Sequence, residues 1–190
     1  VEPENAVSLD FQAKAGFTER PYQGFNKLIN DGQLMFEKAL PTFNVTEACG
    51  KTAAQYIAAI FNSNAKALHS RTIPYRKWCA LLSANDPDER HFLIRKGAVP
   101  CAYLKINGLE SGDETGWISM LAVAPSFQRK GTGAYAVRFA EEFLLKVGKS
   151  CVRIHTTQDN LPARNLYEKC GYSLEDIRTD NDTLTYSKYF

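Results

Sequence analysis

The sequence predicts an α/β protein built on a mixed β-sheet, and three observations lead to this prediction. An apolar run over 117–125, an amphipathic run over 134–147 and a second apolar run over 151–157 follow one another. That is the order of a right-handed βαβ unit with two parallel strands. Alternating runs over 90–110 predict a β-hairpin around Gly97, and two further strand-like runs end the chain. The sheet should therefore contain both parallel and antiparallel neighbours.

Residues 1–41 are predicted to form a helical extension, separate from a domain over 42–190. From Tyr22 to Leu40 apolar residues recur at helical spacing, with an interruption at NDG, and Pro41 ends the pattern. A stripe of this kind must be buried, either against the same chain or against a second subunit, which would make a homodimer. The stripe consists of Phe25, Leu28, Ile29, Phe36 and Leu40.

Two helices are expected before the hairpin. A short alternating strand, TFNVTEA, comes first. Residues Thr52 to Leu68 then form a helical pattern with apolar residues along one face. The run PYRKWCALLS predicts a second helix with Pro74 in its first turn, where proline is well tolerated.

The second half of the chain contains the βαβ unit and its continuation. The strand WISMLAVAP shows little alternation, as expected of a strand covered on both faces. A helix from Ala134 to Val147 follows and is ended by Gly148. After the strand CVRIHTT comes a short helix in LPARNLYEKCGY, ended by Gly171, and then strands near 172–174 and 183–189.

Composition excludes several classes of protein. The net charge of +2 gives no indication of nucleic-acid binding, although the balance of +4 over 42–190 would suit a small polyanion. No apolar run is long enough for a membrane span, and no signal peptide is visible. The cysteines are odd in number and form no CxxC pair, which favours reduced thiols in a cytoplasmic protein. They are Cys49, Cys79, Cys101, Cys151 and Cys170.

The turn QRKGTGA, between the strand and the helix of the βαβ unit, has the properties of an anion receptacle. The start of a helix offers unpaired N–H groups and a partial positive charge. Gly131 and Gly133 lack a Cβ and would let a ligand approach the backbone. Side-chain donors come from Gln128, Arg129 and Lys130. A diphosphate fits this combination.

Two other phosphate-binding motifs are excluded by the spacing of the turn. The NTPase loop needs a Lys directly after its second glycine, and Ala134 stands there. The dinucleotide fingerprint needs a third glycine where this chain has Ala136.

The turn and a later segment together resemble the GCN5-related N-acetyltransferase (GNAT) superfamily. That superfamily has a Q/R-x-x-G-x-G/A turn after a strand ending in V-x-P, and an N-x-x-A-x-x-x-Y-x-x-x-G-F/Y segment further on. This chain has ISMLAVAPSFQRKGTGAYAV and NLPARNLYEKCGY. The resemblance covers about Thr42 to Phe190, and residues 1–41 are outside it. It implies a mixed central sheet, splayed between two central parallel strands and flanked by helices.

The resemblance also implies acetyl-coenzyme A (acetyl-CoA) as cosubstrate. Its diphosphate would bind the turn formed by Gln128, Arg129, Lys130, Gly131, Thr132, Gly133 and Ala134. The pantetheine arm would lie against backbone groups of Leu121 and Val123, and Asn160 would steady it. A backbone N–H of the same strand would polarise the thioester carbonyl.

The resemblance assigns the acid of the reaction more clearly than the base. Tyr167 matches the general-acid tyrosine of the superfamily, and an ordinary phenol can donate to a departing thiolate. Glu114 is the candidate base, and a solvated carboxylate at a hairpin end is the competing interpretation. Thr115 stands where many members carry a carboxylate, so Ser119 on the same strand is expected to hold a water instead. No metal is expected, because His69, His91 and His155 are not spaced as a ligand set.

The predicted activity is acetyl transfer to a primary amine by direct attack in a ternary complex. The acceptor stays open between a small molecule, such as a polyamine or an antibiotic amine, and a peptide, protein or charged tRNA. A non-catalytic module that senses acyl-CoA is the alternative from another class.

Overall fold

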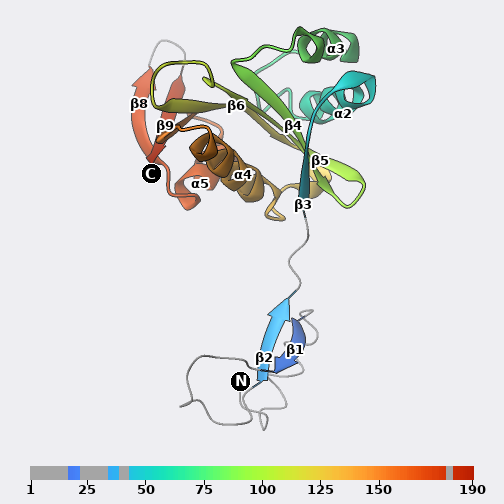
Figure 1. Cartoon of the computed structure of the whole chain (residues 1–190), viewed down its shortest axis with the longest axis vertical. Coiled ribbons are helices and arrows are strands. Elements are labelled where there is room, and N and C mark those ends of the chain that lie inside the picture. Colours follow the sequence, from blue (N-terminus) through green and yellow to red (C-terminus); the bar gives the residue numbers. More distant parts are fainter. Residues whose placement is uncertain (1–16, 22–33, 39–42, 179–181) are drawn as a thin grey trace. The chain divides into compact units, whose positions relative to one another are not determined.

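A computed structural model describes residues 17–21, 34–38, 43–178 and 182–190 of the chain. Its contacts divide the chain into two compact units, Val1–Thr42 and Phe43–Phe190. Figure 1 shows both units.

The first unit contains a pair of antiparallel strands, β1 (Phe17–Pro21) and β2 (Leu34–Lys38), with Phe17 opposite Lys38. The helix predicted over 22–40 is therefore wrong from Leu34 to Lys38. Only a short apolar run follows the NDG interruption, and so short a run is compatible with either a helix or a strand. Pairing with β1 decides for the strand. The rest of the predicted helix, including Phe25, Leu28, Ile29 and Leu40, lies outside the described residues.

The second unit is built on a seven-stranded mixed sheet in the order β3-β4-β5-β6-β7-β9-β8. The strands are β3 (Phe43–Glu47), β4 (Glu89–Lys96), β5 (Val99–Asn107), β6 (Thr115–Val123), β7 (Cys151–Thr157), β8 (Ser173–Arg178) and β9 (Thr183–Tyr189). The pair β6–β7 is parallel, and the other described neighbours in this sheet are antiparallel. The predicted mixed α/β sheet is confirmed.

In the described part of the chain, four α-helices and one short 3₁₀ turn flank this sheet. They are α2 (Gly50–Ser63), α3 (Tyr75–Ala84), the turn Pro125–Phe127, α4 (Thr132–Lys146) and α5 (Leu161–Lys169). None of the helices within the described ranges is both long and apolar enough to span a lipid bilayer.

The helix predicted over Thr52–Leu68 ends early, at Ser63. Asn64 leaves the helical conformation, and its side chain donates to the carbonyls of Ile60 and Val123. Leu68 fits the helical spacing but lies in the turn after α2. Its apolar side chain packs against the hydrophobic cluster that contains α2 and α3 residues.

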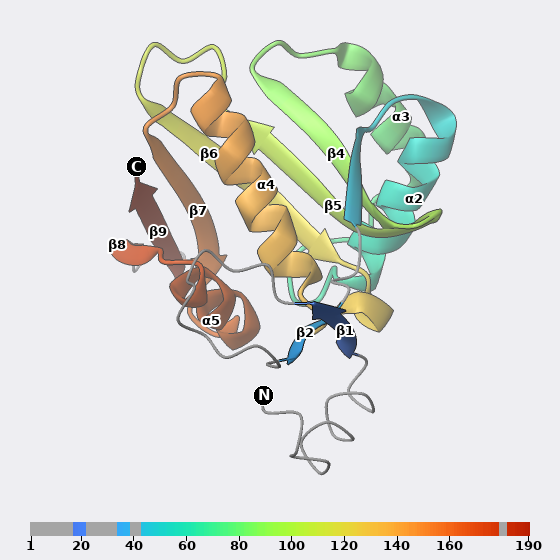
Figure 2. The same cartoon turned by 60° about the horizontal axis from the view of Figure 1, so that its bottom comes forward.

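The sheet has a hydrophobic cluster on each face. Alternation along β4 sends Phe92 and Ile94 to the cluster that includes α4, whereas Leu93 joins the cluster under α2 and α3. Figure 2 shows α4 lying across one face of the sheet and α2 beside β3. On the other face Trp78 packs edge-on against Phe61 and Tyr103, at ring-centroid distances of 5.2 and 5.4 Å.

The two parallel strands separate halfway along their length. Pairing of β6 with β7 runs from Thr115 opposite Cys151 to Ile118 opposite Ile154 and does not continue. At the same level the β5–β6 ladder shifts register, because Lys105 lies opposite Met120 and Ile106 opposite Ile118. Ser119 is thus the extra residue of a β-bulge, and a bulge bends the strand that carries it. The predicted splay between two central parallel strands is confirmed.

Candidate active site

A cavity of about 200 Å³ occupies the gap between the diverging strands. Its walls come from β6, β7, α5 and the turn after α2. The lining residues are 67–69, 118–121, 154–157, Asn160, Ala163 and Tyr167.

The backbone of β6 directs peptide groups into this gap, and some of them have no partner among the described residues. The N–H of Ala124 donates to the carbonyl of Cys101 at 2.9 Å. Since peptide groups alternate along a strand, this bond gives the phase of the β5–β6 ladder, that is, which residues of β6 direct their peptide groups toward β5. In that phase the peptide groups of Leu121 and Val123 face away from β5, toward the splay. The carbonyl of Val123 accepts from Asn64 and Gln128 at 3.1 and 3.0 Å. Leu121 thus offers both peptide groups, and Val123 only its N–H.

Tyr167 forms part of the cavity wall. Its side chain is 5% exposed and packs against the rings of Tyr172 and Tyr186. The hydroxyl has no hydrogen-bond partner among the described residues, and Tyr167 is one of the residues that line the cavity. Burial raises the pKa of Tyr167, so the phenol is protonated at neutral pH and can act as a donor.

The turn before α4 presents a run of unpaired N–H groups. The first helical bond runs from Tyr135 N–H to Gly131 O, at 3.0 Å. The N–H groups of residues 129–134 have no partner within the described part of the chain. Arg129 and Gly131 have φ values of 56° and 83°, and a Cβ at Gly131 would point into open space. Successive N–H groups in such a turn form a concave anion site.

The side chains of this turn mostly hold it in place. Both amide hydrogens of Gln128 have acceptors, Asn64 Oδ1 and Val123 O, each at 3.0 Å. Gln128 therefore anchors the turn on β6, and contact of its side chain with a diphosphate stays a prediction. Thr132 donates to Phe127 O at 3.1 Å, and Lys130 to Ser126 O at 2.8 Å.

Gly133 lies where α4 packs against α5, a contact that the sequence did not show. A Cβ at this position would lie 3.0 Å from a methyl group of Leu166 on α5. The glycine thus allows α4 to pack closely against α5, beside Val123.

Asn160 lies on the cavity wall and caps α5. Its Oδ1 accepts from the N–H of Ala163 at 3.3 Å, and its Nδ2 donates to the carbonyl of Ala67 at 3.5 Å. The second contact links α5 to the turn after α2, so Asn160 closes one side of the cavity.

Glu114 does not lie with the other predicted site residues. It is exposed at the start of β6, accepts from Ser150 Oγ at 2.6 Å, and is not among the residues lining the cavity. At about 3.3 Å per residue it stands roughly 16 Å along the strand from Ser119. This geometry favours the solvated carboxylate over the base.

Two histidines that the sequence did not assign to the site line the cavity. His155 contacts Thr185 Oγ1 through Nδ1 at 3.2 Å and packs on Trp117, with ring centroids 4.6 Å apart. His69 pairs with Asp159 at 3.1 Å and is half-exposed. No sequence pattern marks either histidine, because their neighbours are distant in the chain. No set of three metal-ligating side chains occurs among the described residues.

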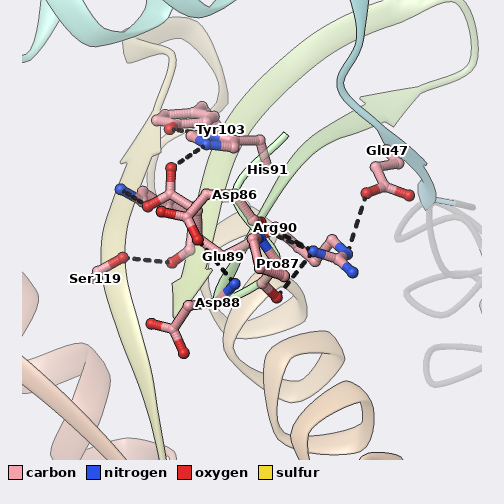
Figure 3. A network of polar contacts seen from close by, with 10 residues as sticks. Glu47, Asp86, Pro87, Asp88, Glu89, Arg90, His91, Tyr103 and Ser119 are labelled. Carbon is pink, nitrogen blue, oxygen red and sulfur yellow. Dashed lines mark hydrogen bonds and ion pairs between the residues drawn. The ribbon is translucent and has the colours of Figure 1, made fainter. Parts of the chain in front are cut away.

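A polar network connects side chains of β4 and β5 with Ser119 of β6, which lines the cavity (Figure 3). Tyr103 OH lies 2.8 Å from His91 Nδ1, and His91 Nε2 lies 2.9 Å from Glu89, which also pairs with Lys105. Burial lowers the pKa of His91 despite the carboxylate of Glu89, so the ring is neutral at neutral pH. With a neutral His91 ring, both ring nitrogens have a suitable partner when Tyr103 donates to Nδ1 and Nε2–H donates to Glu89.

Comparison with known proteins extends these observations. A family model described as the acetyltransferase (GNAT) family matches residues 54–172. The streptothricin acetyltransferase of Escherichia coli is 29% identical over 120 residues, which cover 63% of this chain and 66%, just under two thirds, of that protein.

Solved structures share the fold. An acetyltransferase from Thermus thermophilus superposes with a TM-score of 0.68 at 18% identity, covering 80% of this chain and 99% of the other. The Salmonella typhimurium yncA structure, a putative acetyltransferase with its cofactor acetyl-CoA, gives a TM-score of 0.66 at 16% identity over 77% and 93% of the two chains.

Proposed function

Because the chain belongs to the acetyltransferase (GNAT) family, we propose that it transfers the acetyl group of acetyl-CoA to a primary amine of a small molecule, by direct attack in a ternary complex. The observation that carries the proposal is Tyr167. Tyr167 is a buried residue that lines the same cavity as Leu121, whose peptide groups face the splay, and its hydroxyl has no partner among the described residues.

The described residues fit acetyl-CoA at two places. The unpaired N–H groups of residues 129–134 and the start of α4 suit the diphosphate, and no side chain at Gly131 obstructs them. Arg129 adds an exposed cation. Leu121 offers a donor and an acceptor to the amides of the pantetheine arm, in the manner of an added strand.

Charge develops first on the thioester oxygen when the amine attacks. A backbone N–H of β6 that faces the splay is placed to stabilise that oxygen, and Leu121 is the residue we assign to this role. Ser119 contributes a hydroxyl at the bulge, where it donates to Lys105 O at 3.4 Å and can also hold a water.

Tyr167 then acts on the departing sulfur. An ordinary thiol has a pKa near ~8.5, below that of a phenol, and burial raises the pKa of Tyr167 further. Complete proton transfer from Tyr167 to the thiolate is therefore unfavourable. The phenol instead stabilises the thiolate with a charge-assisted hydrogen bond, and solvent completes the protonation.

The acceptor class rests on different support. The streptothricin acetyltransferase relative points by its name to a small-molecule amine. The test is release of free coenzyme A thiol from acetyl-CoA with streptothricin, spermidine and a lysine peptide as separate acceptors. We expect turnover with at least one of the two small amines. Turnover with the peptide alone would shift the assignment to protein acetylation.

The alternative, a non-catalytic sensor of acyl-CoA, predicts binding without turnover. Titration of acetyl-CoA by calorimetry separates it from the enzyme. Tight binding with no thiol release for any of the three amines would contradict the proposed transfer.

A further inference from the structure

His155 occupies the place in β7 where the splay begins. It follows Ile154, the last residue of β7 that pairs with β6. Ile154 belongs to the cluster under α4, so by strand alternation His155 points to the opposite face of the sheet. It is exposed there, and it also lines the cavity that contains Tyr167.

The imidazole is held in one orientation. Trp117 packs on its ring from β6, and Thr185 Oγ1 on β9 contacts Nδ1 at 3.2 Å. Nε2 has no partner among the described residues. If Nδ1–H donates to Thr185, Nε2 carries the free lone pair, and the same hydrogen bond persists when Nε2 gains a proton.

The surroundings keep the ring neutral. Partial burial, and after it the positive charge of Arg178 on β8, lower the pKa of His155. Arg178 is itself paired with Asp176 at 3.8 Å.

The remaining charged groups nearby are engaged elsewhere. On the same strand Arg153 donates to Glu175 at 2.7 Å, and Asp159 pairs with His69, which lines the cavity. Among the described residues no carboxylate contacts His155, so nothing raises its affinity for a proton.

We propose that His155 Nε2 accepts the proton that the amine nitrogen loses as its bond to the acetyl carbon forms. The inference rests on the proposed function. The nitrogen lone pair attacks the carbonyl carbon, the carbonyl π pair moves to oxygen, and the N–H proton passes to Nε2. The C=O bond then re-forms, the C–S bond breaks, and the sulfur leaves with the bonding pair beside the Tyr167 hydroxyl. The imidazolium proton returns to solvent, and solvent protonates the thiolate.

Proton affinities explain why the proton leaves the nitrogen only as the N–C bond forms. An alkylammonium has a pKa near ~10, far above that of a histidine whose pKa lies below its usual value of ~6.5. His155 therefore cannot deprotonate a bound ammonium efficiently. The nitrogen becomes much more acidic when it bonds to carbon, and a neutral imidazole can then take its proton.

The test is the pH dependence of kcat/KM for His155→Gln, with acetyl-CoA saturating and the best small amine from the panel above. In the unchanged protein both the free amine and His155 must be neutral. The slope of log kcat/KM against pH should therefore be about 1 above the lowered pKa of His155 and approach about 2 below it. In His155→Gln the slope should stay near 1 throughout, and kcat/KM at pH 8 should fall by about 100-fold or more.

His69→Gln is the matched control, because it removes the other cavity histidine and should retain the steeper acidic limb. The thermal upshift caused by acetyl-CoA should persist in His155→Gln, which shows that the variant folds and binds the cosubstrate. An unchanged acidic limb in His155→Gln, with a rate within about 3-fold of the parent, would overturn the proposal. Absence of thiol release from the unchanged protein with every amine contradicts the proposed function itself, and the inference then falls with it.

Discussion

At the scale of single residues, the site is a set of polar atoms whose roles follow from whether protein partners already satisfy them. Gln128 and Asn160 look like ligand-binding side chains, but their hydrogen-bonding groups are mostly engaged within the protein. Tyr167 OH and His155 Nε2 have no such partners among the described residues and both belong to residues that line the cavity. Unsatisfied groups in a cavity are the ones that remain for chemistry.

Tyr167→Phe tests the first of these groups. A hydrogen bond to a charged atom contributes about 1.5–3 kcal/mol, which corresponds to a fall in kcat of about 10- to 100-fold. The acetyl-CoA dissociation constant should stay unchanged, because the ring is retained and the thiolate does not exist in the ground state. Single-turnover kinetics gives the chemical step directly. An unaltered chemical rate would mean that Tyr167 is only a packing residue.

Tyr103→Phe tests whether the Tyr103–His91–Glu89 network stabilises the fold. The change removes the donor to His91 Nδ1 and leaves a buried acceptor unsatisfied, at a cost of about 1–3 kcal/mol in the free energy of unfolding. Urea denaturation at pH 7.5 measures it. Tyr56→Phe, at a tyrosine that is 39% exposed, is the control and should cost little. Equal losses in the two variants would show that the network does not stabilise the fold.

At the scale of elements, the first turn of α4 is subject to two different requirements: stability of the helix start and binding of an anionic ligand. A helix start prefers a negative charge near its unpaired N–H groups, and an anionic ligand competes for the same groups. Gly131 is the N-cap of α4, so Ala134 is its third helical residue. A Glu at this position can reach back to the N-cap N–H as in a capping box.

Ala134→Glu separates these requirements. The carboxylate should stabilise the unliganded helix by about 0.3–1 kcal/mol, yet it should abolish most of the thermal upshift caused by acetyl-CoA. Ala134→Gln, of the same shape without the charge, should retain more of the upshift. Differential scanning fluorimetry with and without acetyl-CoA measures both effects. A full upshift in Ala134→Glu would place the diphosphate elsewhere. Gly133 is a poorer position for this test, because any side chain there also meets Leu166.

At the scale of the whole molecule, the turn, the cavity and both cavity histidines all belong to the unit Phe43–Phe190. The chain before it contributes none of the lining residues within the described ranges. Residues 1–41 remain a predicted separate segment whose role the site does not require.

Deletion of residues 1–41 should therefore leave the affinity for acetyl-CoA unchanged. Any kinetic effect should appear in the acceptor KM, and light scattering on both forms shows whether the segment also sets the oligomeric state. A large loss of acetyl-CoA affinity in a folded truncated chain would contradict this view.

The sequence by itself determined the features that depend on short stretches of chain. A strand, a glycine turn and a helix in succession produce unpaired N–H groups wherever they occur, because the first turn of a helix has no preceding carbonyls to bond. The spacing that suggested Tyr167 as a site residue also lies within one short helix and its cap. The helix expected over 22–40 failed at Leu34–Lys38 because the partner strand that decides between helix and strand lies earlier in the chain.

The tertiary structure alone decided which residues share the cavity. Asn64 reaches Gln128, Thr185 reaches His155, and the bulge at Ser119 accompanies the separation of β6 from β7. Glu114 and Ser119 belong to one short segment, yet Glu114 precedes β6 and Ser119 stands at its middle, whereas His69 and Asp159 are 90 positions apart and touch. Such proximity depends on strand register and sheet order, which arise from packing of the whole domain and leave no signature in local spacing.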